Sequence, residues 1–484
     1  MSTPSSASAP SADPVPRFAE PPKTPPNQTP AHLEQDLAVV RGTPTSAHKP
    51  KSILKPAAAG PDAEMSMLSE RSGAGRKMGG EMQKFTSMYA NAYDEEKNPN
   101  GLVSLNMFRK AANETFEVAD MGYGDGITSS RRLANAMSSF FNDYFDPLEN
   151  VKPEHISFAN GCTALFDQLG HVLCDEGDAI LIPVPFYNAY AWDFSIRTKA
   201  KVVPVPVGSM DEGFEPNSVE AYKRTVDELR QKGVKPRVLV ITNPHNPLGR
   251  TYPRSTLLAL AKFAEEEDLQ LIMNEIYAKS IYENKDWPDA PPFVSALSIN
   301  YAKELGKFDR SRLHLVYGMS KDFCANGLRI GVFVSQHNPE LITTLSGTGF
   351  FVKVSSMADA IWSHILKDRE WLGWFLAENK KRLGEAAQFT REWFQERGVS
   401  VARCNAGNFL MVHMGRRLQI TTEQEEIAIG DKLIAAGVFI ARGGSYKHPT
   451  PGWYRVTFCS DPAKLRVALE RIEKTLDLTP MGKE

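Results

Sequence analysis

Short apolar runs alternate with helix-like stretches between about residues 150 and 335. The runs have the length of buried strands, and the stretches between them have the length of helices. They occupy residues 155–159, 179–183, 201–205, 238–242, 269–273 and 313–317. Alternation at this spacing predicts an α/β fold in which a mostly parallel sheet lies between helices.

The pattern changes at both ends of this region. After about residue 350 it is mainly helical, with strand-like runs at 407–413 and 453–458, and this predicts a smaller C-terminal α/β domain. The first 65 residues are rich in Pro, Ser, Ala and Thr and predict a disordered tail, because they cannot bury enough apolar surface to offset their ordering entropy. The tail is either a docking segment or a tolerated extension. The predicted parts are a tail (1–65), an N-terminal arm (66–117), a large domain (118–350) and a small domain (351–484).

Composition excludes several classes of function. The chain has 484 residues and a net charge of −2, without a basic block, so neither nucleic acid nor an anionic membrane is an expected partner. No apolar run approaches the roughly 20 residues of a membrane span, and no secretory signal opens the chain. The five scattered cysteines lack metal-ligand spacing, so we expect reduced thiols in a cytoplasmic protein and no metal site.

A lysine follows the last apolar run of the large domain. Lys321 comes directly after Gly318, Met319 and Ser320, and Arg329 lies eight residues beyond it. A lysine at the end of a buried strand is costly unless it is neutralised or bonded. Schiff-base formation with an aldehyde uses such a lysine, and a Ser and an Arg nearby can hold a phosphate. Together they predict a covalent seat for pyridoxal 5′-phosphate (PLP), although these few residues alone also fit a chance Ser-Lys beside a strand.

The surrounding segment resembles a known signature. Residues 318–331, Gly-Met-Ser-Lys-Asp-Phe-Cys-Ala-Asn-Gly-Leu-Arg-Ile-Gly, are similar to the lysine signature of class I/II aminotransferases. The likeness is strongest to the branch of 1-aminocyclopropane-1-carboxylate (ACC) synthases and their fungal relatives, and it extends from about residue 68 to about residue 476. It implies PLP fold type I, with a large PLP-binding domain, a smaller C-terminal domain, and a homodimer whose two subunits complete each active site.

Two segments resemble the family's cofactor contacts on the phosphate and on one face of the ring. Asn160-Gly161-Cys162-Thr163 stands between a strand and a helix, where backbone N–H groups form an anion site. Gly161 permits close approach and Thr163 adds a hydroxyl. Pro183-Val184-Pro185-Phe186-Tyr187 resembles the loop whose second aromatic, here Tyr187, stacks on the PLP ring. Without that context an aromatic after a strand is more often part of the core.

Two more segments resemble the contacts to the ring's edge. Asn243-Pro244-His245-Asn246-Pro247-Leu248-Gly249 matches the family pattern Asn-Pro-x-Asn-Pro-x-Gly, and it implies that Asn246 donates to the ring oxygen O3′. In Asn274-Glu275-Ile276-Tyr277, the family implies Tyr277 as a second partner of O3′. The family normally has Asp at the position of Asn274, where the carboxylate keeps the ring nitrogen protonated. An amide cannot stabilise a pyridinium in this way, unless a water or a nearby acid replaces the carboxylate.

The segment 451–458, Pro-Gly-Trp-Tyr-Arg-Val-Thr-Phe, resembles the family's substrate-carboxylate segment. It implies that Arg455 binds an α-carboxylate through a planar two-pronged contact. The alternative is a surface ion pair, but an Arg within an apolar strand is otherwise expensive.

Three further positions depart from the family, and the last of them, a short stretch at 100–123, disfavours a true ACC synthase. Gly318 stands where many relatives have a phosphate-binding Ser. Gly126 or Ile127 stands where a Tyr often reaches the partner subunit's cofactor. Only Ala112-Asn113-Glu114 echoes the family's Ala-Glu-Asn segment.

The sequence therefore predicts a PLP-dependent enzyme that acts on an α-amino acid or a cysteine conjugate. After the substrate displaces Lys321, the freed amine is expected to act as general base on Cα–H. Aminotransfer is the first-ranked reaction, a carbon–sulfur β-lyase of secondary metabolism the second, and an ACC synthase-like lyase the third. The rival from another class is a PLP-binding protein that no longer turns over.

Overall fold

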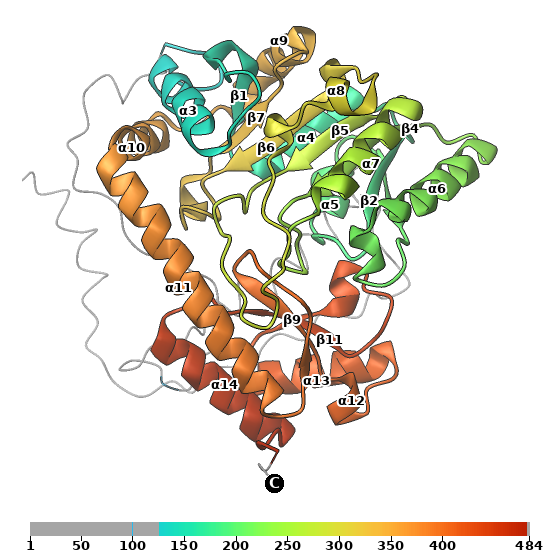
Figure 1. Cartoon of the computed structure of the whole chain (residues 1–484), viewed down its shortest axis with the longest axis vertical. Helices are drawn as coiled ribbons and strands as arrows, with labels where there is room; N and C mark the ends of the chain where they lie inside the picture. The colour runs from blue at the N-terminus through green and yellow to red at the C-terminus, as the bar shows by residue number, and fades with distance from the viewer. Residues whose placement is uncertain (1–98, 100–124, 482–484) are drawn as a thin grey trace, which may run out of the picture. The chain divides into compact units, whose positions relative to one another are not determined.

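The computed structural model describes residue 99 and residues 125–481 (Figure 1). The predicted tail at 1–65 lies outside the described residues, and so does the predicted arm at 66–117 except for Pro99. The boundary predicted at 350/351 stays a prediction.

The described part is built around a seven-stranded sheet. Its strands lie in the order β1 (Ile156–Ala159), β7 (Gly331–Val334), β6 (Leu313–Gly318), β5 (Gln270–Asn274), β4 (Pro236–Thr242), β2 (Ala179–Pro183) and β3 (Lys201–Val205). β7 is antiparallel to both of its neighbours, and the remaining neighbours pair in parallel. The mostly parallel sheet is thus confirmed, and all six apolar runs predicted in this region form strands. β7 was not predicted from the sequence.

Helices cover both faces of this sheet (Figure 1). Alternate residues of β4 show why: Leu239 packs with α7, whereas Val240 packs with α4 on the other face. The first face carries α3 (Arg131–Tyr144), α6 (Val219–Gln231), α7 (Arg254–Glu266), α8 (Tyr301–Leu305) and α10 (Ser356–Lys367). The second face carries α4 (Cys162–Leu173), α5 (Tyr190–Asp193) and α9 (Pro339–Gly349). The sheet is therefore the buried middle layer of three.

The 27-residue helix α11 (Arg369–Gln395) leads from α10 to a second, antiparallel sheet (Figure 1). The strands of that sheet lie in the order β10 (Ala441–Arg442), β11 (Trp453–Thr457), β9 (Phe409–His413) and β8 (Ser400–Val401). The helices of this region are α12 (Gly415–Leu418), α13 (Glu423–Ala435) and α14 (Pro462–Leu476). A core of their apolar side chains with those of α11 holds the small sheet, which includes the two strand-like runs predicted after residue 350.

Short 3₁₀ turns join these elements. They are η2 (Pro153–His155), η3 (Glu212–Phe214), η4 (Pro216–Ser218), η5 (Ala296–Ser298), η6 (Arg310–Arg312), η7 (Asn326–Leu328), η8 (Phe350–Val352) and η9 (Gly443–Tyr446). Among the residues that the structure describes, no helix combines the length and the apolarity that a membrane crossing requires.

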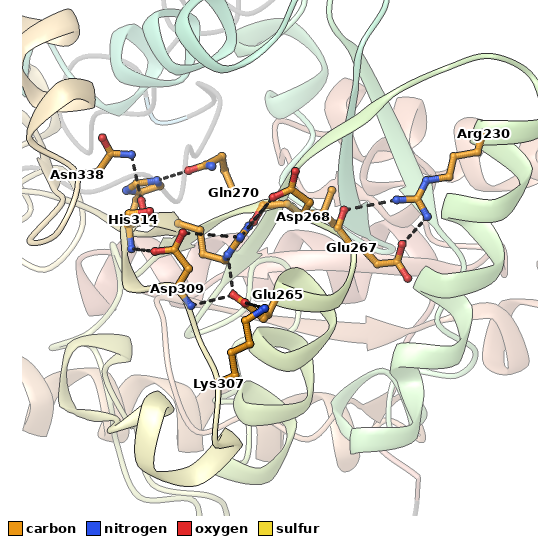
Figure 2. Close-up of polar contacts among 12 residues, drawn as sticks. Arg230, Glu265, Glu267, Asp268, Gln270, Lys307, Asp309, His314 and Asn338 are labelled. Carbon is orange, nitrogen blue, oxygen red and sulfur yellow. Dashed lines mark hydrogen bonds and ion pairs between the residues drawn. The ribbon is translucent and has the colours of Figure 1, made fainter.

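Charged side chains hold the amino ends of β5 and β6 (Figure 2). The buried Arg312 donates to Glu265 at 2.9 Å and to the main-chain oxygen of Leu269 at 3.0 Å. Beside it, His314 is hydrogen-bonded to Gln270 at 2.8 Å. A buried Arg with a carboxylate partner and a main-chain acceptor is well satisfied, so we assign this network a structural role.

An open cleft of about 360 Å³ lies near the amino ends of β4 and β5 and is lined in part by Arg230, Lys235 and Glu267. Its charges are mixed, and Arg230 already pairs with Glu267 at 2.5 Å. The cleft lies at the amino ends of the strands, whereas Lys321 follows the carboxyl end of β6. We therefore do not place the chemistry in this cleft.

Candidate active site

Sheet topology places the predicted site residues together at the carboxyl ends of the parallel strands. Parallel strands end at the same edge of a sheet, and binding sites of α/β proteins lie outside those carboxyl ends. β7 runs the opposite way, so its first residue, Gly331, lies level with Ala159 of β1 and Gly318 of β6. Every loop predicted to bind the cofactor therefore opens at this edge: those after β1, β2, β4, β5 and β6, and the one before β7.

Lys321 lies just beyond the end of β6. Its side chain is half-buried and makes no hydrogen bond or ion pair with the residues that the structure describes. Burial, followed by the positive charge of Arg455, lowers the pKa of this amine. A lowered pKa raises the fraction of neutral amine, which is the form that attacks an aldehyde. Its neighbour Ser320 is half-buried as well.

A cradle for an anion lies at the start of α4. Gly161 caps this helix with φ +89°, and the first N–H groups of a helix have no partner within it. A Cβ at Gly161 would lie 2.2 Å from Nη2 of Arg329, so only glycine lets the guanidinium reach the helix start. Arg329 itself has φ +54° and donates from Nη1 to the main-chain oxygen of Asn326 at 2.9 Å. Thr163, the second residue of α4, is exposed beside this cradle.

Cys162 occupies space that a larger residue at position 318 would need. Its Sγ donates to the main-chain oxygen of Tyr317 at 3.3 Å. A Cβ at Gly318 would lie 3.1 Å from that sulfur and 2.8 Å from the main-chain oxygen of Ile330. The absence of a serine at Gly318 therefore has a packing reason. Burial raises the pKa of the Cys162 thiol to about 12, so it stays protonated at neutral pH.

Asn246 links the two sheets at the site. Its Oδ1 accepts from Nη1 of Arg455 at 3.0 Å, which directs its Nδ2 toward the hydroxyl of Tyr277 at 3.4 Å. Burial raises the pKa of the Tyr277 phenol well above its usual value, so this group is a neutral hydrogen-bond donor. The predicted contacts to the ring oxygen and to the substrate carboxylate thus come from neighbouring side chains.

Arg455 is a guanidinium without a carboxylate partner among the described residues. It lies 4.7 Å from the ring centre of Phe409 and 4.8 Å from that of Tyr446. Its Nε is buried and has no hydrogen-bond partner in the described part of the chain. A half-buried cation with an unused donor is costly unless a ligand completes it, and the geometry of a carboxylate matches this group.

Asn274 ends β5 and belongs to a neutral hydrogen-bond chain. Its Oδ1 accepts from the backbone N–H of Ile276 at 3.3 Å, and this fixes the orientation of the amide. Its Nδ2 donates to the Tyr190 hydroxyl at 2.5 Å, which in turn is bonded to the Thr242 hydroxyl at 2.7 Å. Burial raises the pKa of Tyr190, so no member of this chain carries a negative charge at neutral pH.

Asp322 joins the Lys321 loop to the loop that carries Tyr277. Its buried carboxylate accepts from Ser280 Oγ at 2.5 Å, from the Lys279 backbone N–H at 2.9 Å and from the Tyr317 hydroxyl at 3.0 Å. Burial raises its pKa to about 6 despite these bonds.

Several neighbours of the site were missed in the sequence. They are Tyr190, Asp193, Phe409 and Tyr446, which belong to no motif and reach the site only through tertiary packing. The Tyr187 ring, which was predicted to stack on the cofactor, meets Tyr190 edge-on with the centroids 5.3 Å apart. A carboxylate in this region, Asp193, could have been noted as the only acid in a run of aromatic and small residues (186–194).

The residues at this edge fit PLP with one exception. The free Lys321 amine suits the aldehyde, and the space left by Gly161 beside Arg329 suits a phosphate. The neutral pair of Asn246 and Tyr277 suits the ring oxygen. The exception is Asn274, which offers the ring nitrogen an amide in place of a carboxylate.

Comparisons with known proteins agree with this fit. The family model described as "Aminotransferase class I and II" matches residues 84–472. The chain is 30% identical over 374 residues to "Probable aminotransferase aclI" of Aspergillus oryzae, covering 77% of this chain and 87% of that protein. It is also 30% identical over 414 residues to "1-aminocyclopropane-1-carboxylate synthase 2" of Cucurbita pepo, covering 80% and 81% of the two chains.

A relative described as inactive is among the similar proteins. "Probable inactive 1-aminocyclopropane-1-carboxylate synthase-like protein 2" of Mus musculus is 28% identical over 410 residues, covering 80% of this chain and 68% of that protein. Among solved structures, a Thermus thermophilus aspartate aminotransferase variant superposes with a TM-score of 0.65 at 20% identity, covering 85% of this chain and all of that one. At this identity the superposition shows the fold, which is that of PLP fold type I.

Proposed function

The chain belongs to the class I and II aminotransferase family, whose members depend on PLP, and from this premise we propose that it is an aminotransferase of α-amino acids. Lys321 carries the proposal, because its amine is free, half-buried and lowered in pKa at the carboxyl edge of the sheet. These are the properties that an aldehyde-binding lysine and a proton-transferring base both need.

The other side chains have proposed roles around this lysine. The N–H groups after Gly161, the hydroxyls of Thr163 and Ser320, and the Arg329 guanidinium would hold the phosphate. Tyr187 would cover one ring face, with Asn246 and Tyr277 on the ring oxygen. When bound, PLP supplies an electron-withdrawing ring that stabilises negative charge on the carbon bearing the amino group.

Arg455 would orient the substrate. A carboxylate on the guanidinium supplies the acceptor that the buried Nε lacks. With the carboxylate fixed, the Lys321 amine can take the proton from the adjacent carbon and return one elsewhere. Cys162 would line the cradle without ionising, because burial holds its pKa at about 12.

A carbon–sulfur β-lyase is the second candidate, and a specific observation favours it. Asn274, Tyr190 and Thr242 form a neutral chain where the family has a carboxylate. Without that carboxylate, negative charge on the substrate carbon is less well stabilised, so reactions that expel a leaving group early lose less. Cysteine conjugates are the substrates that such a reaction would take, and an ACC synthase-like elimination is a third outcome of the same site.

A PLP-binding protein without turnover is the rival from another class. Asn274 and Gly318 favour it, as does the existence of a relative described as inactive. The free Lys321 and the half-buried Arg455 oppose it, since an Arg455 guanidinium that lacks a carboxylate partner and has an unused Nε is costly unless a substrate completes it.

The experiment that tests the proposal is a product assay on purified protein reconstituted with PLP. Amino acids and cysteine conjugates are offered with a 2-oxo acid, and new amino acid, keto acid, ammonia and thiol are followed together. New amino acid without ammonia supports aminotransfer, whereas ammonia with thiol and keto acid supports β-elimination. Absence of all products with PLP bound supports the rival.

Borohydride reduction locates the cofactor on the chain. We expect the label on the peptide that contains Lys321 and not on the one with Lys279, a second half-buried lysine whose pKa burial lowers as well. Lys321→Ala should lose both the label and the turnover. A label on any other lysine refutes the assignment of Lys321.

A further inference from the structure

A buried carboxylate adjoins the anion cradle and has no role in the proposed chemistry. Asp193 ends α5 and is 6% exposed. Its Oδ2 accepts a single hydrogen bond, from Thr163 Oγ1 at 3.5 Å, and its Oδ1 accepts none from the described residues. A carboxylate placed beside a phosphate seat repels the ligand that the seat is built for, so its presence needs an explanation.

The hydrogen bond between Thr163 and Asp193 can take two arrangements, and the protonation state of Asp193 decides which one forms. A threonine hydroxyl has one hydrogen to donate, and an ionised carboxylate can only accept. While Asp193 is ionised, the hydrogen of Thr163 is committed to it and is not available to a phosphate. When Asp193 is protonated, the carboxyl O–H donates to Thr163 Oγ1, and the threonine hydrogen is free to turn toward the cradle.

We propose that Asp193 makes this anion seat proton-coupled, so that a phosphate ester enters it together with one proton that Asp193 takes up. The inference rests on the proposed function, because it takes the cradle at Gly161, Thr163 and Arg329 as the phosphate seat. It assigns Asp193 as a positioning residue that acts through Thr163.

The charges around Asp193 agree with this coupling. Burial raises its pKa to about 7, and the hydrogen bond from Thr163 and the charge of Arg329 only partly offset that rise. Asp167 of α4 adds a further negative charge nearby. A phosphate in the cradle places more negative charge beside the carboxylate, which raises the pKa further and draws in the proton.

The other ionisable groups facing this corner stay in one charge state. Burial keeps Cys162, Tyr187 and Tyr190 protonated at neutral pH, and the Arg329 guanidinium adjoins them at Gly161. Lys321 is the exception, because an anion nearby can also raise the proton occupancy of a lysine whose pKa is lowered. The test therefore compares variants rather than relying on the wild type alone.

The sign of the effect follows from these directions. Below about pH 7 Asp193 is protonated before the ligand arrives, so binding takes up little. Above that pH part of the binding free energy is used to protonate Asp193. The affinity for the ligand should therefore fall by about tenfold between pH 7 and pH 8.5. The ligand's own phosphate is mostly dianionic over this range and contributes little to the change.

The probe is pyridoxine 5′-phosphate, which has the ring and phosphate of PLP but an alcohol in place of the aldehyde, so it cannot react with Lys321. Its binding to the full chain is measured by titration calorimetry at pH 7 and 8.5 in two buffers of different ionisation enthalpy. We expect the wild type to take up close to one proton more at pH 8.5 than Asp193→Asn does. Asp193→Asn, whose amide mimics the protonated acid, should bind about 30-fold tighter than the wild type at pH 8.5, where only a few per cent of free Asp193 is protonated, and should show little pH dependence.

Two further variants make the result specific. Thr163→Val keeps the shape but removes the hydroxyl, so it should bind more weakly and lose the Asp193-linked proton uptake. Glu176→Gln is the matched control, because this acid follows α4, pairs with Lys199 at 2.5 Å and is not among the charges that act on Asp193, so it should behave as the wild type does.

Equal proton uptake and equal pH dependence in the wild type and Asp193→Asn would overturn the inference. Failure of every variant to bind the probe, with folded protein by circular dichroism, would instead overturn the phosphate seat and the proposed function with it. Binding of inorganic phosphate with the same proton uptake would show that the cradle alone carries the coupling, as expected.

Discussion

Arg455 is the residue that we propose to bind the substrate carboxylate, and its environment makes a quantitative prediction. Arg455→Lys keeps the charge but loses the planar fork, so kcat/KM should fall by the equivalent of roughly 2–4 kcal/mol while PLP stays bound. Steady-state kinetics on the preferred amino acid measure this. Arg442→Lys on the neighbouring strand β10 is the matched control and should change kcat/KM little. An unchanged kcat/KM in Arg455→Lys would remove the residue from the site.

Asn274 is the residue that we propose to determine the balance between aminotransfer and elimination. Asn274→Asp keeps the acceptor for the Ile276 N–H, and the Tyr190 hydroxyl can reverse its bond to donate to the new carboxylate. We expect the variant to raise aminotransfer relative to elimination and to raise long-wavelength absorbance with a slow substrate. The measurements are the ratio of amino-acid to ammonia product and the absorption spectrum. If neither changes, another group already replaces the missing carboxylate, and the electronic argument is wrong.

At the scale of elements, the start of α4 is pressed against the first residue of β7 in the large sheet. A Cβ at Gly331 of β7 would lie 2.6 Å from the backbone nitrogen of Cys162, which is main chain and cannot move aside cheaply. Gly331→Ala should therefore displace the helix start, weaken binding of pyridoxine 5′-phosphate and lower the free energy of unfolding by about 1–3 kcal/mol. Titration calorimetry and urea unfolding measure the two effects.

The matched control for this change is Gly347→Ala in α9. A Cβ there meets nothing within 4 Å, and alanine is favoured over glycine in a helix by roughly 1 kcal/mol. This variant should be neutral or stabilising and should bind the phosphate ester as the wild type does. A Gly331→Ala protein that matched the control would show that the close approach has no energetic consequence.

The elements of the large sheet were predictable for a physical reason that fails for β7. The six runs predicted there are mostly apolar, because β2, β4, β5 and β6 lie inside the sheet, so their alternation with helices identifies them. β7 has four residues, follows a turn ending in a left-handed Arg329, and runs antiparallel. Its apolar side chains gave no separate signal within the lysine segment, and its direction is set only by pairing with β1 and β6.

The site, too, has a part that could be predicted from the sequence and a part that could not. Sequence motifs placed Lys321, Asn246 and Arg455 on separate segments, and the sheet topology explains why these segments meet. The hydrogen bond from Asn274 to Tyr190 and the bond from Thr163 to Asp193 carry no motif. The first depends on how α5 packs against the end of β5, and the second on how α5 packs against α4, and no local pattern specifies either.

At the scale of the whole molecule, exposed apolar side chains predict a homodimer. Ile127 is 53% exposed, Phe350 70% and Phe351 88%, and the main-chain oxygen of Val352 bonds to the N–H of Asn160 beside the anion cradle. A patch of this kind next to a site is typical of an interface. Phe351→Glu should shift the protein toward the monomer in sedimentation velocity and lower its turnover.

The control for the dimer is Trp374→Glu on α11, another exposed aromatic at 59%. It should leave the sedimentation coefficient unchanged. A monomeric wild type at micromolar concentration would contradict the prediction, as would a dimer that survives the change at Phe351.

Buried acids also set how stability varies with pH. Burial raises the pKa of Glu275 from 4.5 to about 8. Between these two pH values the native state keeps the proton of Glu275, whereas the unfolded state has released it. Stability from this group is present below that window and is lost as pH rises through it. The free energy of unfolding should therefore fall from pH 6.5 to pH 8, and Glu275→Gln should flatten that fall. Urea unfolding at several pH values measures it, and an equal slope in the two proteins would contradict it.

Arg455 rests against two aromatic rings and a neutral amide, with its Nε unused, and this has a practical consequence for any assay. A guanidinium in that state attracts any small carboxylate, whether or not it carries an amino group. Acetate, formate or citrate in the buffer should compete with the substrate and raise the apparent KM without changing kcat. Substrate preferences measured in such buffers would rank amino acids by how well they displace the buffer anion.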